Sequence, residues 1–264
     1  MAALEELLQQ ADQLNHQLQQ QRDWDQQSIH TALSIEYTYD SNRIEGNTLT
    51  LRETELVIHK GLTIGGKPLV EHLEAVNHYE AVDVIRDWVQ QQIPLNRANL
   101  LALHGLILRG IDRDNSGKFR TVPVMISGSR HTPPQPWQID KLMEEYFIYY
   151  EQAANALHPI LLAAEMHERL VTIHPFIDGN GRTARLVMNL ILLQHHYPLA
   201  IIHGDTESRL AYYDALEQCN IGQDKSAFHR LIVETVIATQ QRLLHFAVPP
   251  DGAAPQGAAP YDVL

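Results

Sequence analysis

The sequence predicts an all-α helical bundle with one short β-hairpin flap. Apolar residues recur every three or four positions through most of the 264 residues, and this spacing places them on one face of a helix. The composition agrees, because 44% hydrophobic and 20% charged residues are ordinary values for a globular protein. One run of β-branched residues, between positions 117 and 136, interrupts the helical rhythm.

The first three predicted helices lie in the N-terminal quarter of the chain. Leucines at helical spacing among glutamines predict an amphipathic helix over residues 4–21, and a second helix follows over 26–42. A third begins at Thr50, which can form a capping box with Glu53, and it stops before Gly61.

The same periodicity predicts the remaining helices, which prolines and glycines separate from one another. They span residues 68–91, 96–109, 139–152, 159–173, 183–194, 208–220 and 226–246. Between the second and third of these, the β-branched run TVPVMI leads into Gly128 and a cluster of prolines. That pattern predicts a short strand or hairpin, which forms the flap.

One core with two appendages is the predicted domain organisation. A single domain commonly contains up to ~250 residues, so residues 31–247 are expected to form one helical domain. Residues 1–30 are expected to form an N-terminal helical extension. Residues 248–264 are rich in proline, glycine and alanine and offer little to bury, which predicts a flexible tail.

The net charge and the cysteine content restrict the binding partners and the cellular compartment that we expect for this protein. A net charge of −12 without a basic cluster argues against a nucleic-acid partner, because phosphate backbones are bound mainly by basic residues. A single cysteine, Cys219, excludes an intramolecular disulfide and suits a reducing compartment. No run of ~18 apolar residues indicates a membrane span. We therefore expect a cytoplasmic protein that binds neither nucleic acid nor membrane.

The segment HPFIDGNGRTAR, residues 174–185, joins two apolar helices and predicts an anion site. The N-terminus of a helix presents free backbone N–H groups and the positive end of the helix dipole. The glycines around Asn180 let a phosphate approach the backbone closely. Arg182 and Arg185, three residues apart, lie on one helical face, where their guanidiniums can grip phosphate oxygens.

Two further residues of this segment carry ionisable groups suited to phosphate chemistry. Asp178 provides a hard carboxylate that can hold Mg²⁺ against substrate phosphates. His174 is the natural general base, since the unperturbed pKa of histidine lies close to neutral pH. Taken singly, these features have ordinary alternatives: the glycines form a turn, the histidine lies in a core, and the arginines lie on a solvated helix face.

In their order and spacing these residues resemble the signature of the Fic domain family. That signature has a histidine, one residue, phenylalanine, one residue, an acidic residue, then Gly-Asn-Gly-Arg and a second arginine three positions later. The resemblance covers roughly residues 35–246 and is strongest to the N-terminally inhibited (class II) members from the animal endoplasmic reticulum and from bacteria. It implies a Fic-type helical bundle, with residues 31–247 as the catalytic domain.

The resemblance also implies an activity, that of a protein adenylyltransferase (AMPylator). His174 would deprotonate a Ser, Thr or Tyr hydroxyl of a target protein, and the oxygen would attack the α-phosphorus of ATP. Asp178 would hold Mg²⁺. The residues implied to bind the phosphates are Gly179, Asn180, Gly181, Arg182 and Arg185.

A second motif, Ser41-Asn42-Arg43-Ile44-Glu45-Gly46, resembles the family's inhibitory helix, here placed near residues 35–46. The resemblance implies that Glu45 pairs with Arg185 in place of the γ-phosphate of ATP, with Ser41 and Gly46 as the other residues of the motif. The alternative is an ordinary helix end, with Glu45 solvated and Gly46 as the C-cap.

Other family features map onto less distinctive residues. The flap near residues 118–128 would bind the target protein by adding it as a strand, although an ordinary surface hairpin is the alternative. Tyr212, Tyr213 and Asn220 resemble the wall beside the adenine, although a tyrosine pair on a helix usually belongs to the core. The resemblance also implies a homodimer and possible self-modification.

Two other functions remain open at this point. The same site could act in reverse, as a de-AMPylating phosphodiesterase in which Glu45 positions water. Alternatively, the chain could be a nucleotide-binding helical regulator or a toxin component without transferase activity. Some relatives transfer other groups, such as UMP, phosphocholine or phosphate, and the motif does not determine the nucleotide.

Overall fold

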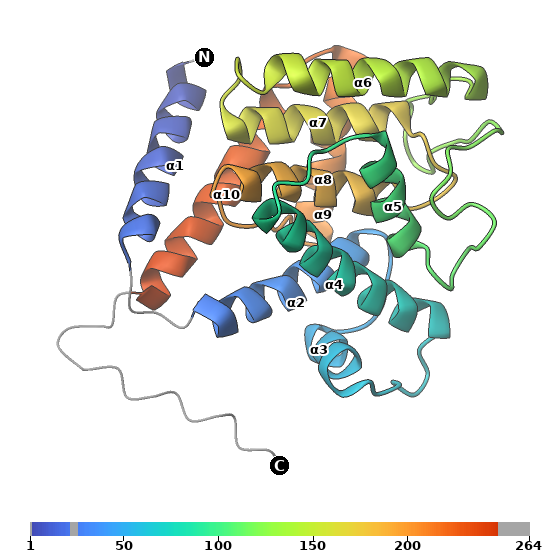
Figure 1. The fold of residues 1–264 in the computed structure, drawn as a ribbon, viewed down its shortest axis with the longest axis horizontal. Coiled ribbons are helices and arrows are strands. Elements are labelled where there is room, and N and C mark those ends of the chain that lie inside the picture. Colours follow the sequence, from blue (N-terminus) through green and yellow to red (C-terminus); the bar gives the residue numbers. More distant parts are fainter. Residues whose placement is uncertain (1, 22–25, 248–264) are drawn as a thin grey trace.

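The computed structural model describes residues 2–21 and 26–247, and it is built from helices (Figure 1). Its ten α-helices correspond one to one to the predicted helices, with ends moved by a few residues. They are α1 (Ala2–Gln20), α2 (Gln26–Ile44), α3 (Leu51–Lys60), α4 (Leu69–Gln90), α5 (Arg97–Ile107), α6 (Ile139–Ala153), α7 (Pro159–Ile173), α8 (Asn180–Gln194), α9 (Thr206–Glu217) and α10 (Ser226–Ala247). The predicted tail, 248–264, lies outside the described residues.

The start and end of α3 follow the predicted local chemistry. The Thr50 side chain accepts a hydrogen bond from the Glu53 N–H, and the Glu53 carboxylate accepts one from the Thr50 N–H at 2.7 Å. Both halves of the capping box are therefore present. Gly61 ends the helix with a φ of 61°, the left-handed conformation that glycine adopts without a steric penalty.

The predicted β-hairpin flap is wrong, because the described residues contain no strand. Residues 118–135 run as turns and irregular backbone. Pro123, Pro133 and Pro134 lack the N–H groups that a strand ladder needs. A two-stranded hairpin is also marginal without a third strand or a covering layer. We call residues 118–128 the flap segment; the side chain of Met125 within it is almost fully exposed.

The core is centred on α8, which lies in the interior of the bundle (Figure 1). Every residue from Arg182 to Leu192 on this helix is buried, and α8 contacts α7, α4, α5 and α2. An ordinary surface helix buries only one stripe, so a helix buried on all sides must be surrounded by others. The N-terminal end of α8, where the predicted anion site lies, is therefore enclosed by several elements.

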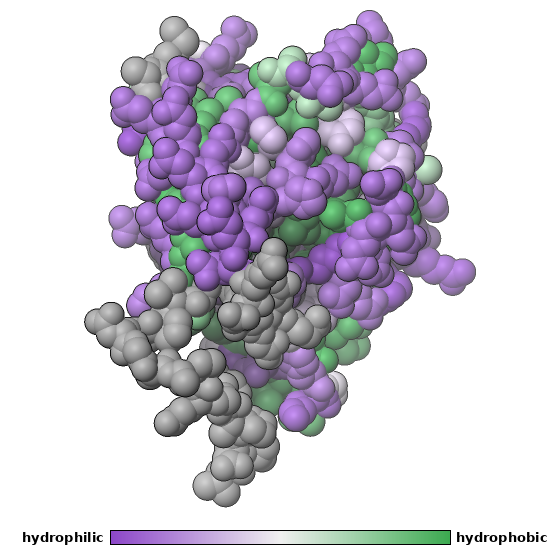
Figure 2. Space-filling model, turned by 60° about the vertical axis from the view of Figure 1, so that its left-hand side comes forward, coloured by the Kyte–Doolittle hydropathy of each residue, from purple (hydrophilic) through white to green (hydrophobic). Residues whose placement is uncertain are grey.

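The N-terminal helix α1 packs along α10 at one side of the bundle (Figure 1). Gln240 of α10 donates a hydrogen bond to the carbonyl of Ala11 at 3.0 Å, and both residues are fully buried. Figure 2 brings this side forward and shows mainly hydrophilic residues on it, as expected when an amphipathic helix turns its leucines inward. Among the described residues, no helix combines the length and apolarity needed to cross a membrane.

Candidate active site

The segment between α7 and α8 forms a tight loop that its own side chains hold closed. His174 ends α7 with a φ of 51°, and its N–H donates to the carbonyl of Leu170. Gly179 precedes α8 with a φ of 77°. The buried Asn180 side chain accepts a hydrogen bond from the N–H of Phe176 and donates one to the Phe176 carbonyl, both at 3.0 Å. We call residues 174–181 the catalytic loop.

His104 of α5 holds this loop in place by contacts with Phe176 and Asp178. Its ring stacks on Phe176 with centroids 3.6 Å apart. Its Nδ1 accepts the Gly117 N–H at 3.0 Å, so its Nε2 donates to the Asp178 carbonyl at 2.9 Å. Burial lowers the pKa of His104 to about 4, which keeps the ring neutral and in this one tautomer at neutral pH. No motif in the sequence marks His104 for this contact.

The ring of His174 is oriented so that one nitrogen remains free to act as a base. Nδ1 lies 3.2 Å from the carbonyl of Val171, a contact that places the proton on Nδ1 and leaves the lone pair on Nε2. Burial lowers the pKa of His174 below its ordinary value of 6.5. The imidazole is therefore neutral at neutral pH and can accept a proton.

Arg185 is fully buried and binds the end of α2. Its Nε donates to the Ser41 hydroxyl at 3.0 Å, and its Nη2 donates to the Ser41 carbonyl at 2.8 Å and to the Glu45 carboxylate at 2.6 Å. Burial alone would lower the pKa of Arg185, but the adjacent Glu45 carboxylate raises it above the ordinary value. The structure thus brings together Ser41, Glu45 and Arg185, three of the predicted site residues.

The Glu45 carboxylate lies directly against the first turn of α8. A Cβ added at Gly181 would collide with a carboxylate oxygen of Glu45, so only glycine leaves room for this contact. The first turn of a helix favours an anion through its free N–H groups and its dipole. Glu45 therefore places a negative charge where the sequence predicted a phosphate. Gly46 follows the end of α2 with a φ of 99°, which glycine adopts without strain.

Arg182 binds different partners from Arg185. Its Nη1 donates to Glu74 of α4 at 2.9 Å, and its Nη2 donates to the Asp178 carboxylate at 3.2 Å. The Asp178 side chain is 61% exposed, so one face of its carboxylate is open to a further ligand. The sequence did not indicate Glu74, because it lies 108 positions from Arg182 with no motif around it.

Of the three residues predicted beside the adenine, Tyr212 and Tyr213 lie together, with ring centroids 5.4 Å apart, whereas Asn220 has other partners. The Tyr212 ring is buried, and its hydroxyl lies 3.4 Å from Nη1 of Arg185 and 3.1 Å from Nε2 of His167. The half-exposed Tyr213 donates its hydroxyl to the carbonyl of Ile44 at 3.1 Å. Asn220 accepts a hydrogen bond from the Thr172 hydroxyl at 2.5 Å. Tyr212 and Tyr213 therefore contact the residues around the Glu45–Arg185 pair.

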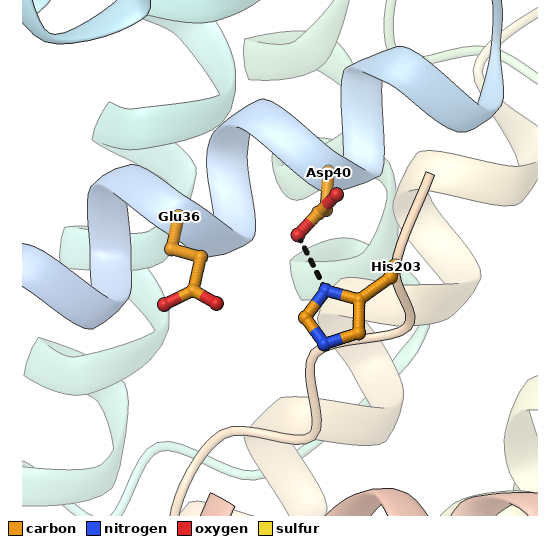
Figure 3. A group of neighbouring side chains, drawn as sticks. All are labelled: Glu36, Asp40 and His203. Carbon is orange, nitrogen blue, oxygen red and sulfur yellow. Dashed lines mark hydrogen bonds and ion pairs between the residues drawn. The ribbon is translucent and has the colours of Figure 1, made fainter. Parts of the chain in front are cut away.

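Glu36 and Asp40 of α2 form a cluster with His203, which precedes α9 (Figure 3). Their ligand atoms lie within 4.8 Å of one another, a grouping that could hold a metal ion. Each carboxylate already has strong partners, however. Asp40 accepts hydrogen bonds from His203 Nδ1 and from the Gly204 N–H, both at 2.9 Å, and Glu36 forms a bidentate pair with Arg242 at 2.7 Å. These partners compete with a cation, so we interpret the cluster as an anchor of α2.

Comparison with known proteins gives independent evidence of the family to which this chain is related. The Fic/DOC family description matches residues 94–192 of this chain. The protein adenylyltransferase Fic of Drosophila grimshawi is 38% identical over 202 residues, which is 76% of this chain and 41% of that protein. The relative from Drosophila mojavensis is also 38% identical, over 76% of this chain and 39% of its own length. The chain thus spans about two fifths of the length of these relatives.

Two solved structures share the fold over nearly the whole chain. Fic-1 from C. elegans superimposes with a TM-score of 0.82 at 26% identity, covering 92% of this chain and 72% of the other. A Fic domain containing signaling protein from Bacteroides thetaiotaomicron gives a TM-score of 0.83 at 28% identity, covering 91% of this chain and 96% of the other. Sequence motif, helical architecture and site geometry agree with these comparisons, and the chain belongs to the Fic/DOC family.

Proposed function

We propose that this chain is a protein adenylyltransferase that transfers AMP from ATP to a Ser, Thr or Tyr hydroxyl of a target protein. The observation that carries the proposal is the Glu45 carboxylate held by Arg185 over Gly181, at the N-terminus of α8. A site that holds this carboxylate with a buried guanidinium and a helix N-terminus is suited to the phosphates of a nucleotide. Relatives that carry the name protein adenylyltransferase share 38% identity with the chain.

The reaction assigns one chemical role to each part of the catalytic loop. The acceptor hydroxyl loses its proton to Nε2 of His174, its oxygen forms a bond to the α-phosphorus of ATP, and the bond to the bridging oxygen breaks, releasing pyrophosphate. The N–H groups of residues 179–181 and the guanidiniums of Arg182 and Arg185 bind the phosphate oxygens. Tyr212, Tyr213 and Asn220 are proposed to line the adenine side.

The residues present fit a magnesium ion bound together with the nucleotide. Asp178 offers one exposed carboxylate beside the first turn of α8, and Mg²⁺ commonly uses one or two protein carboxylates plus phosphate oxygens. When bound, Mg²⁺ supplies positive charge that neutralises the phosphates. Arg182 lies 3.2 Å from the same carboxylate and fixes its position.

We further propose that Glu45 inhibits the transfer. Nη2 of Arg185 is already bound to Glu45 and to the Ser41 carbonyl, so a γ-phosphate must displace the carboxylate before it can use this donor. Two anions cannot share one buried guanidinium without repulsion. ATP that enters beside Glu45 is therefore held in a pose that does not align the α-phosphorus with the acceptor.

The flap segment is proposed to bind the target protein near residues 118–128. Its backbone is irregular and its Val122 and Met125 side chains are exposed, so main-chain and apolar groups are available to an incoming segment. The root of the flap segment adjoins the base, because the N–H of Arg120 donates to the carbonyl of Pro175 at 2.9 Å. A residue of the chain itself that reached this segment would be modified in the same way.

A homodimer is also proposed, formed through the region where α3 leads into α4. Three apolar side chains are exposed there, on the connecting loop and on the first turn of α4, and a fourth is exposed at the first residue of α3. They are Leu51, Leu62, Leu69 and Val70. Exposed apolar groups gathered in one region are typical of an interaction surface. Light scattering of the purified chain, with Leu69→Asp as the variant, tests this: a monomeric wild type contradicts it.

The test of the activity uses ATP labelled on the α-phosphate, with the γ-labelled nucleotide as the control. The purified chain, its Glu45→Gly variant and its His174→Ala variant are each incubated with cell lysate and Mg²⁺. Label from the α-phosphate, but not from the γ-phosphate, is expected on proteins, most strongly with Glu45→Gly and not with His174→Ala. Label from neither position with any variant would reject a transferase.

The reverse reaction uses the same residues and is the second candidate. The charge of Glu45 acts on His174 and opposes in part the lowering of its pKa by burial, and we propose that this carboxylate orients a water molecule beside the base. Proteins labelled by the Glu45→Gly variant are then incubated with the wild-type chain. Release of AMP by the wild type, but not by Glu45→Gly, would assign removal of AMP to this chain.

A further inference from the structure

Arg120 is a buried arginine whose guanidinium binds three backbone carbonyls. It is 4% exposed. Its Nε donates to the carbonyl of His174 at 2.7 Å, Nη1 to that of Val122 at 3.1 Å, and Nη2 to that of Pro134 at 2.6 Å. Burial lowers the pKa of Arg120, and within the described residues no carboxylate interaction offsets this. A buried cation without a counter-charge is costly, which calls for a specific role.

The three carbonyls belong to two parts of the proposed site. Val122 lies in the flap segment, and Pro134 lies where the chain returns from it toward α6. The guanidinium therefore ties the two ends of the loop 122–134 together. The third carbonyl belongs to His174, the proposed general base. A planar guanidinium offers donors in a fixed fork, so these three acceptors cannot move independently while it is bound.

His174 is a residue whose backbone needs such a restraint. Its φ of 51° lies in the left-handed region, which is strained for a residue that carries a Cβ. In this conformation its N–H remains bound to Leu170 and its Nδ1 lies beside the Val171 carbonyl. The hydrogen bond from Arg120 holds the remaining backbone polar group of His174.

We propose that Arg120 is a positioning residue that couples the flap segment to the general base His174. By holding the His174 carbonyl together with both ends of the loop 122–134, it fixes the ring in the orientation that leaves Nε2 free for the acceptor hydroxyl. A target segment bound on the flap is thereby held in register with the base. This inference rests on the proposed function, because it takes His174 as the base.

The positive charge of Arg120 also affects the pKa of His174. The charged and titratable groups that act on His174 are Arg120, Glu45 of α2 and His131, which precedes α6. Burial is the largest influence and lowers the pKa of His174, and Arg120 and His131 lower it further, whereas Glu45 raises it. Removing the charge of Arg120 is therefore expected to raise the pKa of His174 and to reduce the neutral fraction at mildly acidic pH.

The first test observes His174 directly and needs no activity. The full chain is labelled with ¹⁵N in histidine, the His174 signals are assigned with His174→Ala, and tautomer and pKa are followed by NMR. The variants are Arg120→Gln, Arg120→Lys, and Arg113→Gln as the matched control on an exposed arginine of the same region. Arg120→Gln should raise the pKa of His174 and mix its tautomers. Arg120→Lys should keep the pKa close to wild type but still mix the tautomers, because a compact ammonium lacks the planar fork with which the guanidinium reaches all three carbonyls.

Two results overturn the inference. One is a folded Arg120→Gln protein whose His174 tautomer and pKa match those of the wild type and of Arg113→Gln. The other is unfolding of both Arg120 variants, which assigns the residue to fold stability alone. Circular dichroism and the melting temperature, measured on the same samples, separate these two cases.

The second test measures transfer in the uninhibited Glu45→Gly background, with self-modification by α-labelled ATP as the readout. Arg120→Lys should lower kcat by about tenfold to a hundredfold, the cost of a slightly misplaced group, while KM for ATP stays within about twofold. An equal loss in kcat and in ATP affinity contradicts a positioning role. If the NMR result holds but no variant transfers label, the proposed function fails and the contact between Arg120 and His174 stands.

Discussion

The catalytic loop and the C-terminal end of α2 face one another across the first turn of α8, yet they are held in different ways. In the catalytic loop, side chains bind backbone groups. Asn180 binds both polar groups of Phe176, His104 binds the Asp178 carbonyl, and Arg120 binds the His174 carbonyl. Each of these three side chains is buried.

The end of α2 is held by a carboxylate–guanidinium pair and by hydrogen bonds to α4 and α9. Glu45 is bound by Arg185 of α8, and the Ile44 carbonyl accepts the hydroxyl of Tyr213 from α9. Asn42 donates to the Glu74 carbonyl of α4 at 3.3 Å, which is a long hydrogen bond. The Glu45 side chain is 31% exposed, whereas that of Arg185 is 1% exposed.

This difference indicates which contact of the proposed site another anion could exchange more easily. The loop is fixed by contacts that its neighbours keep whether or not α2 is in place, so its geometry is preorganised. At the end of α2, the Glu45 carboxylate is 31% exposed, and it is this group that we propose another anion displaces. Variants of the loop should therefore remove activity, and variants of the α2 end should increase it.

The largest expected effect is that of His174→Ala. A positioned general base supplies about 10²–10⁴ in rate and little ground-state binding, so transfer should fall by that factor while ATP affinity and the melting temperature stay near wild type. The measurement is α-label transfer in the Glu45→Gly background, together with nucleotide titration. His16→Ala, an exposed histidine on α1, is the control. Transfer at the control rate would remove His174 from the mechanism.

Asp178→Ala should reduce transfer by about a hundredfold, because a bound metal supplies several kcal/mol of charge stabilisation. The loss should be accompanied by a weaker Mg²⁺ dependence, since Asp178 is the proposed protein ligand. Initial rates over a range of Mg²⁺ concentrations check both effects. Asp114→Ala, at an exposed aspartate, is the matched control. An unchanged Mg²⁺ titration in Asp178→Ala contradicts the role as a ligand.

Glu45→Gly tests the C-terminal end of α2 and should increase the rate of AMP transfer. A partly buried, charge-assisted hydrogen bond is worth about 1.5–3 kcal/mol, and ~1.4 kcal/mol corresponds to one decade. Its loss should speed transfer about tenfold to a hundredfold at saturating ATP and Mg²⁺. Glu45→Gln, which keeps the shape without the charge, should show a smaller gain.

Arg185→Ala separates inhibition from phosphate binding within the same pair. The substitution releases Glu45 but also deletes a phosphate ligand, so the enzyme should stay weak. Parallel rate measurements on Glu45→Gly and Arg185→Ala decide the point. If Arg185→Ala is activated as strongly, or if Glu45→Gly shows no gain, the α2 end has no inhibitory role.

Ser41→Ala is expected to have the smallest effect on the pair. It removes the hydroxyl that accepts from Nε of Arg185, whereas the Ser41 carbonyl still accepts from Nη2. A single hydrogen bond is worth about 0.5–1.5 kcal/mol net, so transfer should rise roughly twofold to tenfold. A gain equal to that of Glu45→Gly would show that the hydroxyl, and not the carboxylate, holds the α2 end.

The helices and the catalytic loop were predictable because their signals are local. Apolar spacing located all ten helices, and the Thr50–Glu53 capping box formed as predicted, since both depend on residues a few positions apart. The flap prediction failed for the opposite reason. Strand propensity in TVPVMI needs a partner strand, and here the carbonyls of Val122 and Pro134 bind the side chain of Arg120 instead.

By itself, the sequence determined the helical architecture, the order of the loop residues 174–185 and the motif around Glu45. Only the tertiary structure decided which partners meet. In it the two arginines of α8 have different partners: Arg182 binds Glu74, and Arg185 binds Glu45. The Arg120 guanidinium binds the His174 carbonyl. The reason is physical: helical periodicity reports which face of each helix is buried, but the packing of distant helices fixes which buried polar groups satisfy one another.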